Sequence, residues 1–127
     1  MANQKKVLII EDDAPLREMY KTRLEAAKFK VLEAKDGEEG INLALEEHPD
    51  LILLDILMPK KGGLGVLEIL KTNPSTKPIP VIILTALLNE EYRSAASRFG
   101  VTDYFVKSQS MPGDILKKVQ EVLGVQS

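Results

Sequence analysis

The sequence has 127 residues, of which 44% are hydrophobic and 28% are charged, and its formal net charge is -2. This length fits a single domain with a real core, the composition is ordinary for a soluble globular protein, and the small net charge gives no reason to expect direct nucleic-acid binding. The absence of cysteine excludes disulfides and thiolate metal sites.

The first apolar run, Val7 to Ile10, is too short for a signal peptide or a membrane span. We therefore expect a cytoplasmic protein with no membrane partner. The run at 7–10 predicts a first buried strand, and the apolar runs at 51–54 and 81–84 predict two more. Two further strands are predicted at 30–34 and 103–106. The run at 30–34 is more polar than the others, which suits a strand at the edge of a sheet.

Between and after these runs, apolar residues recur at helical spacing, which predicts five helices. Asp13 is a good N-cap for the first helix and Asn89 for the fourth, and Gly100 fits the end of the fourth. Asp36-Gly37 is expected to form the turn before the second helix, whose buried stripe includes Leu45. Strands that alternate with helices in this way require a parallel sheet covered on both faces. The sequence therefore predicts one doubly wound α/β domain.

Polar side chains follow four of the predicted strands. They are Glu11-Asp12-Asp13, Asp55, Thr85 and Lys107. Because the carboxyl ends of parallel strands meet at one edge of a sheet, these groups can converge there. Several carboxylates in one crevice repel each other unless a cation joins them, and an oxygen-rich site suits Mg²⁺. The single histidine, His48, is expected at the opposite end of a helix, which argues against zinc.

A carboxylate beside Mg²⁺, with a hydroxyl and an ammonium nearby, suits the transfer of a phosphoryl group. Asp55 stands alone after the central strand and is the candidate nucleophile, which would form an aspartyl-phosphate. The cation and the Lys107 ammonium would neutralise charge on the transferred group, and Thr85 would donate a hydrogen bond to it.

These pieces resemble, in order and spacing, the receiver domain of two-component response regulators over residues 5–124. The matching segments are Glu11-Asp12-Asp13, Asp55-Ile-Leu-Met-Pro59 with Gly63, Thr85-Ala86 and Asp103-Tyr-Phe-Val-Lys107. The resemblance implies a flavodoxin-like fold with strand order 2-1-3-4-5 and a single receiver domain over residues 1–127. It also implies phosphoryl transfer to Asp55 from the phosphohistidine of a histidine kinase or phosphotransfer protein.

For the metal, the resemblance implies that Asp12 binds Mg²⁺ directly and Glu11 binds it through water. Asp55 itself and the backbone carbonyl of Leu57 complete the implied ligand set. Asp13 matches a less central position, and we interpret it mainly as a helix cap.

For the switch, Thr85 and Lys107 match the phosphate-sensing hydroxyl and ammonium. Tyr104 matches the aromatic residue that turns inward when the threonine moves. By the resemblance, this changes the binding face built from the fourth helix, the fifth strand and the fifth helix.

Two departures from the family pattern concern this site. Ser108 follows Lys107 where the family usually has proline, often after a cis peptide bond that aims the lysine. Leu57 and Leu87 match positions that tune loss of the phosphoryl group, and neither can orient a water molecule. The expectation is slow self-dephosphorylation.

The leading interpretation is a stand-alone response regulator that catalyses only its own phosphorylation and dephosphorylation and signals to a downstream protein. It would act as a monomer or as a weak, phosphorylation-dependent dimer. Alternatives are a phosphorelay intermediate, a phosphate sink, and a degenerate receiver that serves only as a binding module. A small phosphatase or a flavodoxin-like redox protein is also an alternative, but a flavoprotein favours a glycine-rich loop where this chain has Glu11-Asp12-Asp13.

Overall fold

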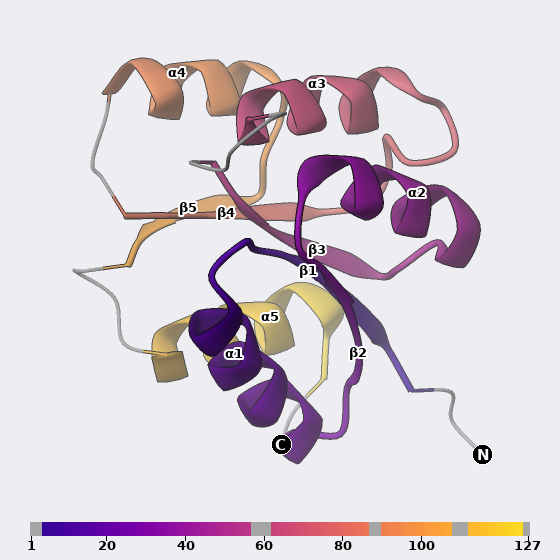
Figure 1. The fold of residues 1–127 in the computed structure, drawn as a ribbon, viewed down its shortest axis with the longest axis vertical. Helices are drawn as coiled ribbons and strands as arrows, with labels where there is room; N and C mark the ends of the chain where they lie inside the picture. Colours follow the sequence, from indigo (N-terminus) through magenta and orange to yellow (C-terminus); the bar gives the residue numbers. More distant parts are fainter. Residues whose placement is uncertain (1–3, 57–61, 87–89, 108–111, 126–127) are drawn as a thin grey trace.

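The strands and helices alternate along the chain (Figure 1). The computed structural model describes residues 4–56, 62–86, 90–107 and 112–125. Within these ranges the elements are β1 (Lys6–Ile10), α1 (Ala14–Ala26), β2 (Lys30–Ala34), α2 (Gly37–Glu47), β3 (Leu51–Asp55), α3 (Gly63–Thr72), β4 (Val81–Thr85), α4 (Glu90–Arg98), β5 (Asp103–Val106) and α5 (Pro112–Leu123). The predicted alternation is confirmed.

The strands form one parallel sheet in the order β2-β1-β3-β4-β5. This is the doubly wound, flavodoxin-like arrangement that was expected. β1, β3 and β4 occupy the interior of the sheet, and almost every residue in them is buried. β2 lies at an edge and is only partly buried, in agreement with its more polar sequence.

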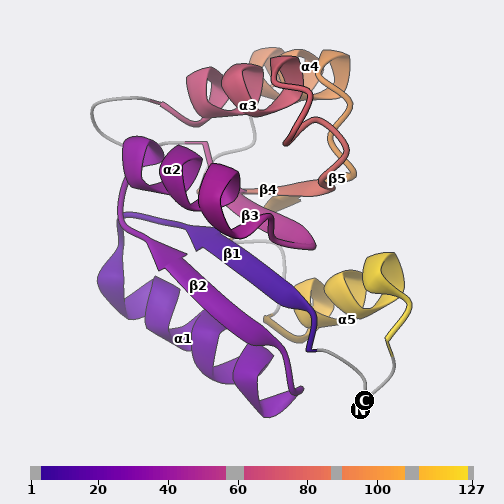
Figure 2. The same cartoon turned by 90° about the vertical axis from the view of Figure 1, so that its right-hand side faces the viewer.

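Helices cover both faces of the sheet (Figures 1 and 2). α1 and α5 pack on one face, and α2, α3 and α4 pack on the other. Alternate residues of each central strand enter the two cores, as the pleat of a strand requires. Leu8 and Ile10 of β1 belong to the core beneath α2 and α3, whereas Val7 and Ile9 belong to the core beneath α1 and α5.

Two of the predicted helix ends are confirmed. The Asp13 carboxylate accepts a hydrogen bond from the Leu16 amide at 3.0 Å and so caps α1. Gly100 follows α4 with a φ of +78°, a conformation that glycine adopts at little cost. Asn89, the expected cap of α4, lies outside the described residues.

Two predictions about α2 are corrected. Asp36 is the N-cap of this helix, because its side chain accepts from the Glu39 amide, and Gly37 is the first helical residue rather than part of a turn. Leu45 is 37% exposed rather than buried. Its neighbour Ala44 is fully buried, and a step of one residue turns a helical side chain by about 100° away from the core.

The register of the sheet brings the carboxyl ends of its strands together. Asp55 of β3 pairs with Leu84 of β4, and Thr85 pairs with Val106 of β5. The Lys107 amide donates to the Thr85 carbonyl at 2.7 Å, which extends the pairing by one residue. The side chains that leave this edge therefore start close to one another. No helix in the described ranges has the length and apolar character needed to cross a membrane.

Candidate functional site

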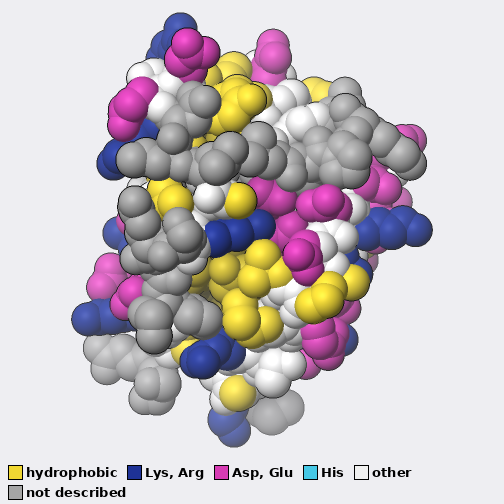
Figure 3. Space-filling model, turned by 60° about the vertical axis from the view of Figure 1, so that its left-hand side comes forward, with side chains coloured by type: hydrophobic (Ala, Val, Ile, Leu, Met, Phe, Trp, Pro, Cys, Tyr) yellow, Lys and Arg dark blue, Asp and Glu magenta, His cyan; other side chains and the backbone are white. Residues whose placement is uncertain are grey.

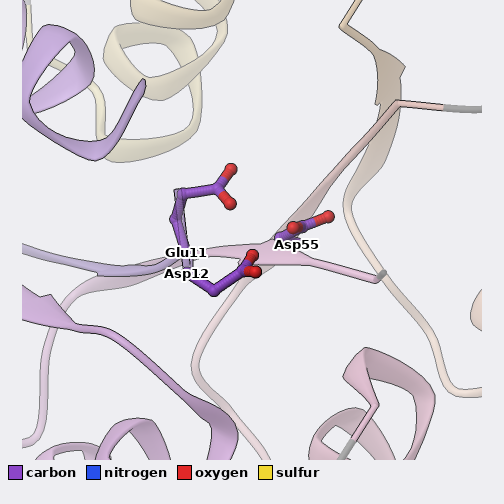
Figure 4. Close-up of side chains that lie close together, drawn as sticks. All are labelled: Glu11, Asp12 and Asp55. Atoms are coloured by element: carbon purple, nitrogen blue, oxygen red, sulfur yellow. The ribbon is translucent and has the colours of Figure 1, made fainter. Parts of the chain in front are cut away.

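Three carboxylates converge at the carboxyl edge of the sheet (Figure 4). Glu11 and Asp12 follow β1, and Asp55 ends β3. One carboxylate oxygen from each of the three residues lies within 4.8 Å of the others. Glu11 and Asp55 are buried and Asp12 is exposed, so the cluster is closed on its inner side and open on its outer side.

Lys107 reaches into this cluster from the end of β5. Its ammonium is 2.5 Å from Glu11 Oε1 and 3.6 Å from Asp55 Oδ2. The positive charge offsets part of the repulsion between the two buried carboxylates. Ser108, which replaces the usual proline, lies outside the described residues, yet the Lys107 side chain is directed into the site.

Glu11 is held through its side chain and its backbone. Its Oε2 accepts a hydrogen bond from the Asp13 amide at 3.2 Å. Its carbonyl oxygen accepts one from the Arg17 guanidinium at 2.7 Å, and the same guanidinium donates to Glu33 Oε1 at 3.3 Å. No role for Arg17 or Glu33 was predicted from the sequence. Two sequence features could have pointed to these residues: Arg17 is a charged residue one turn after the cap of α1, and Glu33 is an acidic residue in the short edge strand.

The backbone of Asp55 is closely approached by Gly63, the first residue of α3. A Cβ atom at this glycine would lie 2.4 Å from the Asp55 carbonyl oxygen and 2.4 Å from Ile56 Cα. The Gly63 amide donates to the Ile56 carbonyl at 2.9 Å. Only glycine fits here without displacing the end of β3. The adjacent Gly62 is far less restricted, because its nearest neighbour would be 3.9 Å away.

Thr85 ends β4, and Tyr104 lies on the neighbouring strand β5, where it pairs with Ile83, two residues before Thr85. Thr85 is fully buried, and the Tyr104 hydroxyl is buried close to it. Burial raises the pKa of Tyr104, and the nearby Thr85 hydroxyl and Arg93 guanidinium reduce that rise. The Arg93 guanidinium carbon lies 5.9 Å from the centre of the Tyr104 ring, on the α4 side.

Tyr20 of α1 lies beneath the acidic residues in the core that α1 and α5 share. It is 4% exposed, and burial raises its pKa to about 12, with further contributions from the negative charges of Glu11 and Asp55. Its phenol therefore forms part of the apolar floor of the site and stays protonated.

Leu57, whose carbonyl was an expected metal ligand, and Leu87 lie outside the described residues. His48 is exposed at the C-terminal end of α2, as expected for a residue outside the site. The structure thus brings together Glu11, Asp12, Asp55 and Lys107.

The donor set fits a hard divalent cation. All three groups of the cluster are carboxylates, and the chain has no cysteine. Oxygen ligands with an open side suit Mg²⁺, which keeps several of its waters in protein sites. In the view of Figure 3, acidic side chains gather near the middle of the visible surface, beside basic side chains and above hydrophobic ones.

Known proteins share this sequence and this fold. Residues 7–120 match the family described as the response regulator receiver domain. The phosphate regulon transcriptional regulatory protein PhoB of Klebsiella pneumoniae is 38% identical over 119 residues, which cover 94% of this chain and 52% of PhoB. The chain thus spans about half the length of the curated relatives it matches.

Solved structures agree. The chemotaxis protein CheY4 of Vibrio cholerae superposes with a TM-score of 0.87 at 28% identity and covers 94% of this chain and 99% of its own. The receiver domain of the sensor histidine kinase PA1611 of Pseudomonas aeruginosa was solved with a magnesium ion in its active-site cleft. It has the same fold, with a TM-score of 0.85 at 21% identity. The match covers 96% of this chain and 99% of that one. The chain therefore belongs to the response regulator receiver domain family of two-component signalling systems.

Proposed function

We propose that Asp55 is the phospho-acceptor of this receiver domain, and that the phosphoryl group comes from the phosphohistidine of a histidine kinase or a phosphotransfer protein. The observation that carries this proposal is the setting of the Asp55 carboxylate. It is buried at the end of β3, 3.6 Å from the Lys107 ammonium and beside the carboxylates of Glu11 and Asp12. Membership of the family supports it.

Glu11, Asp12 and Asp55 are the residues that would hold Mg²⁺. The bound cation would neutralise charge on the transferring phosphoryl oxygens and lower the repulsion that otherwise opposes the approach of a phosphate to a carboxylate. The magnesium ion in the receiver domain of PA1611 supports this assignment. The expected ligand at the Leu57 carbonyl lies outside the described residues.

The protein side chains have separate roles in the proposed reaction. A carboxylate oxygen of Asp55 attacks the phosphorus while the bond to the donor's imidazole nitrogen breaks. Lys107, already 3.6 Å from Asp55 Oδ2, moves its positive charge from the carboxylate to the new phosphoryl oxygens. Thr85, buried one strand away, supplies a hydroxyl to the same group.

The signal would leave through the face formed by α4, β5 and α5. Tyr104 supports this route in two ways. The Thr85 hydroxyl is close enough to the buried Tyr104 hydroxyl to affect the pKa of Tyr104. The Tyr104 ring also faces Arg93 of α4. A movement of Thr85 toward the phosphoryl group would change the space that the phenol occupies. A downstream protein would then read the position of Tyr104 and of α4.

Incubation with acetyl phosphate and Mg²⁺, followed by intact-mass measurement, tests the proposal. We expect the wild-type protein to gain one phosphoryl group and Asp55→Asn to gain none. Asp50→Asn is the matched control, since Asp50 precedes the same strand at its opposite end and contacts the Lys6 amide at 2.8 Å. Chelation of the metal should prevent the gain. A wild-type protein that gains no phosphoryl group would be a binding module instead.

A further inference from the structure

Arg17 connects three elements next to the acidic cluster. It lies in the first turns of α1 and is partly buried, with 19% of its side chain exposed. One arm donates to the Glu11 carbonyl at 2.7 Å, and its Nε donates to Glu33 Oε1 on β2 at 3.3 Å. The guanidinium therefore joins α1, the segment that follows β1, and the edge strand.

The peptide bond that Arg17 holds carries two of the cluster's residues. The Glu11 amide continues the sheet by donating to the Ala34 carbonyl at 3.0 Å. The Glu11 carbonyl, which belongs to the same peptide plane as the Asp12 amide, accepts from Arg17. The orientation of this plane sets the directions in which the Glu11 and Asp12 side chains leave the backbone. A guanidinium that fixes the plane thus fixes both carboxylates.

Glu33 keeps the guanidinium in place. Its second oxygen is 3.2 Å from the Lys21 ammonium of the next turn of α1, so one carboxylate binds two cations of the same helix. The hydrogen bond to Glu33 is the main cause of a raised pKa at Lys21. Because the arms of a guanidinium are planar and rigid, one fixed arm orients the other.

We propose that Arg17 is a positioning residue for the metal-binding carboxylates Glu11 and Asp12, and that Glu33 anchors it. The inference rests on the proposed function of the cluster as a Mg²⁺ site. Positioning and simple electrostatics predict opposite results for Arg17→Ala. Loss of a nearby positive charge would by itself tighten Mg²⁺ binding, whereas loss of positioning weakens it.

The experiment measures Mg²⁺ affinity of the unphosphorylated protein by following backbone amide signals in an NMR titration. We expect Arg17→Ala to weaken binding about 10-fold, the lower end of the range for residues that support metal ligands. Arg17→Lys should weaken binding by a smaller factor, because an ammonium keeps the charge and lacks the rigid fork. Arg23→Ala, which removes an exposed arginine from the same helix, should leave affinity unchanged.

Urea unfolding without metal provides the second measurement. An Arg17→Ala protein with lower stability and unchanged or tighter Mg²⁺ binding would overturn the proposal and leave Arg17 a structural residue. If Arg17→Ala does not fold, Arg17→Lys decides the matter: wild-type affinity overturns the proposal, and weaker binding supports it, since the charge is the same. A wild-type protein that binds no Mg²⁺ would overturn the proposed metal site and this role with it. Wild-type binding that both variants retain overturns this role alone.

Discussion

At Gly63 the absence of a side chain determines how closely the chain passes the backbone of Asp55. A Cβ atom there would meet the Asp55 carbonyl oxygen and Ile56 Cα at 2.4 Å, and both are backbone atoms that have little freedom to move. The Gly63 amide donates to the Ile56 carbonyl at 2.9 Å, so the start of α3 lies directly against the end of β3. The geometry of Asp55 thus depends on a residue with no polar group.

We expect Gly63→Ala to lower the free energy of unfolding by about 1 to 3 kcal/mol, as overpacking of a tight site does. It should also slow phosphorylation by acetyl phosphate, because the end of β3 must move. Gly62→Ala is the matched control. The neighbours of Gly62 begin at 3.9 Å, and its cost should stay below about 1 kcal/mol, for a poorer helix cap. Urea unfolding and intact mass measure the two effects, and equal losses in both variants would contradict the steric explanation.

Sequence reasoning identified the side chains that meet at the carboxyl edge of the sheet, but not the residues that hold them in place. Asp55 and Asp12 follow apolar runs, which is a pattern visible in the sequence. Arg17 acts on Glu11 through a backbone carbonyl, and any residue type presents a carbonyl. Gly62 and Gly63 look alike in sequence as parts of a turn, and only the approach of β3 distinguishes them.

At the scale of elements, helix α1 combines the capping, packing and site functions of this edge. Asp13 caps its first turn, and Tyr20 and Leu24 bury its inner face. This helix was predicted correctly because its apolar spacing is regular and its cap is a strong signal. The second helix was predicted less well: Leu45 is as apolar as the true buried residues, so composition alone did not show that it faces outward. The αL conformation of His48 at the end of α2, with a φ of +48°, had no sequence signal either.

The packing of α1 predicts a pH dependence of stability. The pKa of Tyr20 rises from an ordinary 10.0 to about 12 in the folded protein, first because of burial and then because of Glu11 and Asp55. Between these values the folded state keeps a proton that the unfolded state has lost. The contribution of Tyr20 to stability is therefore complete below pH 10.0 and is lost as the pH rises toward about 12.

Urea unfolding at a series of alkaline pH values measures this effect. Wild-type stability should fall more steeply across that window than the stability of Tyr20→Phe, which has no proton to lose. Absorbance should show one fewer late phenolate titration in Tyr20→Phe than in the wild type, because both proteins keep Tyr104, whose pKa burial also raises. A variant whose phenolate titration matches that of the wild type would assign the step near pH 12 to another tyrosine.

At the scale of the whole molecule, the topology gathers three carboxylates at the carboxyl edge of the sheet. The strand order was predictable in outline, since alternating elements restrict a parallel sheet to few arrangements and the resemblance chose one of them. The site follows from that topology, because β1, β3 and β5 deliver Glu11, Asp55 and Lys107 to the same place. Lys107 compensates the two buried carboxylates, whereas Asp12 is exposed beside them. Three carboxylates this close repel one another, and under the proposed function a bound cation would relieve that repulsion.

We therefore expect Asp12→Asn to have opposite effects with and without metal. When a chelator removes the metal, Asp12→Asn should be more stable than the wild type by up to about 1 kcal/mol. The substitution removes one of three neighbouring negative charges, at an exposed position. Mg²⁺ at tenfold its dissociation constant should stabilise the wild type by about 1.4 kcal/mol and Asp12→Asn far less.

Glu68→Gln, which removes an exposed charge from α3, should respond to Mg²⁺ as the wild type does. Thermal and urea unfolding in both conditions test the pair of effects. An Asp12→Asn protein that Mg²⁺ stabilises as strongly as the wild type would show that Asp12 does not bind the ion.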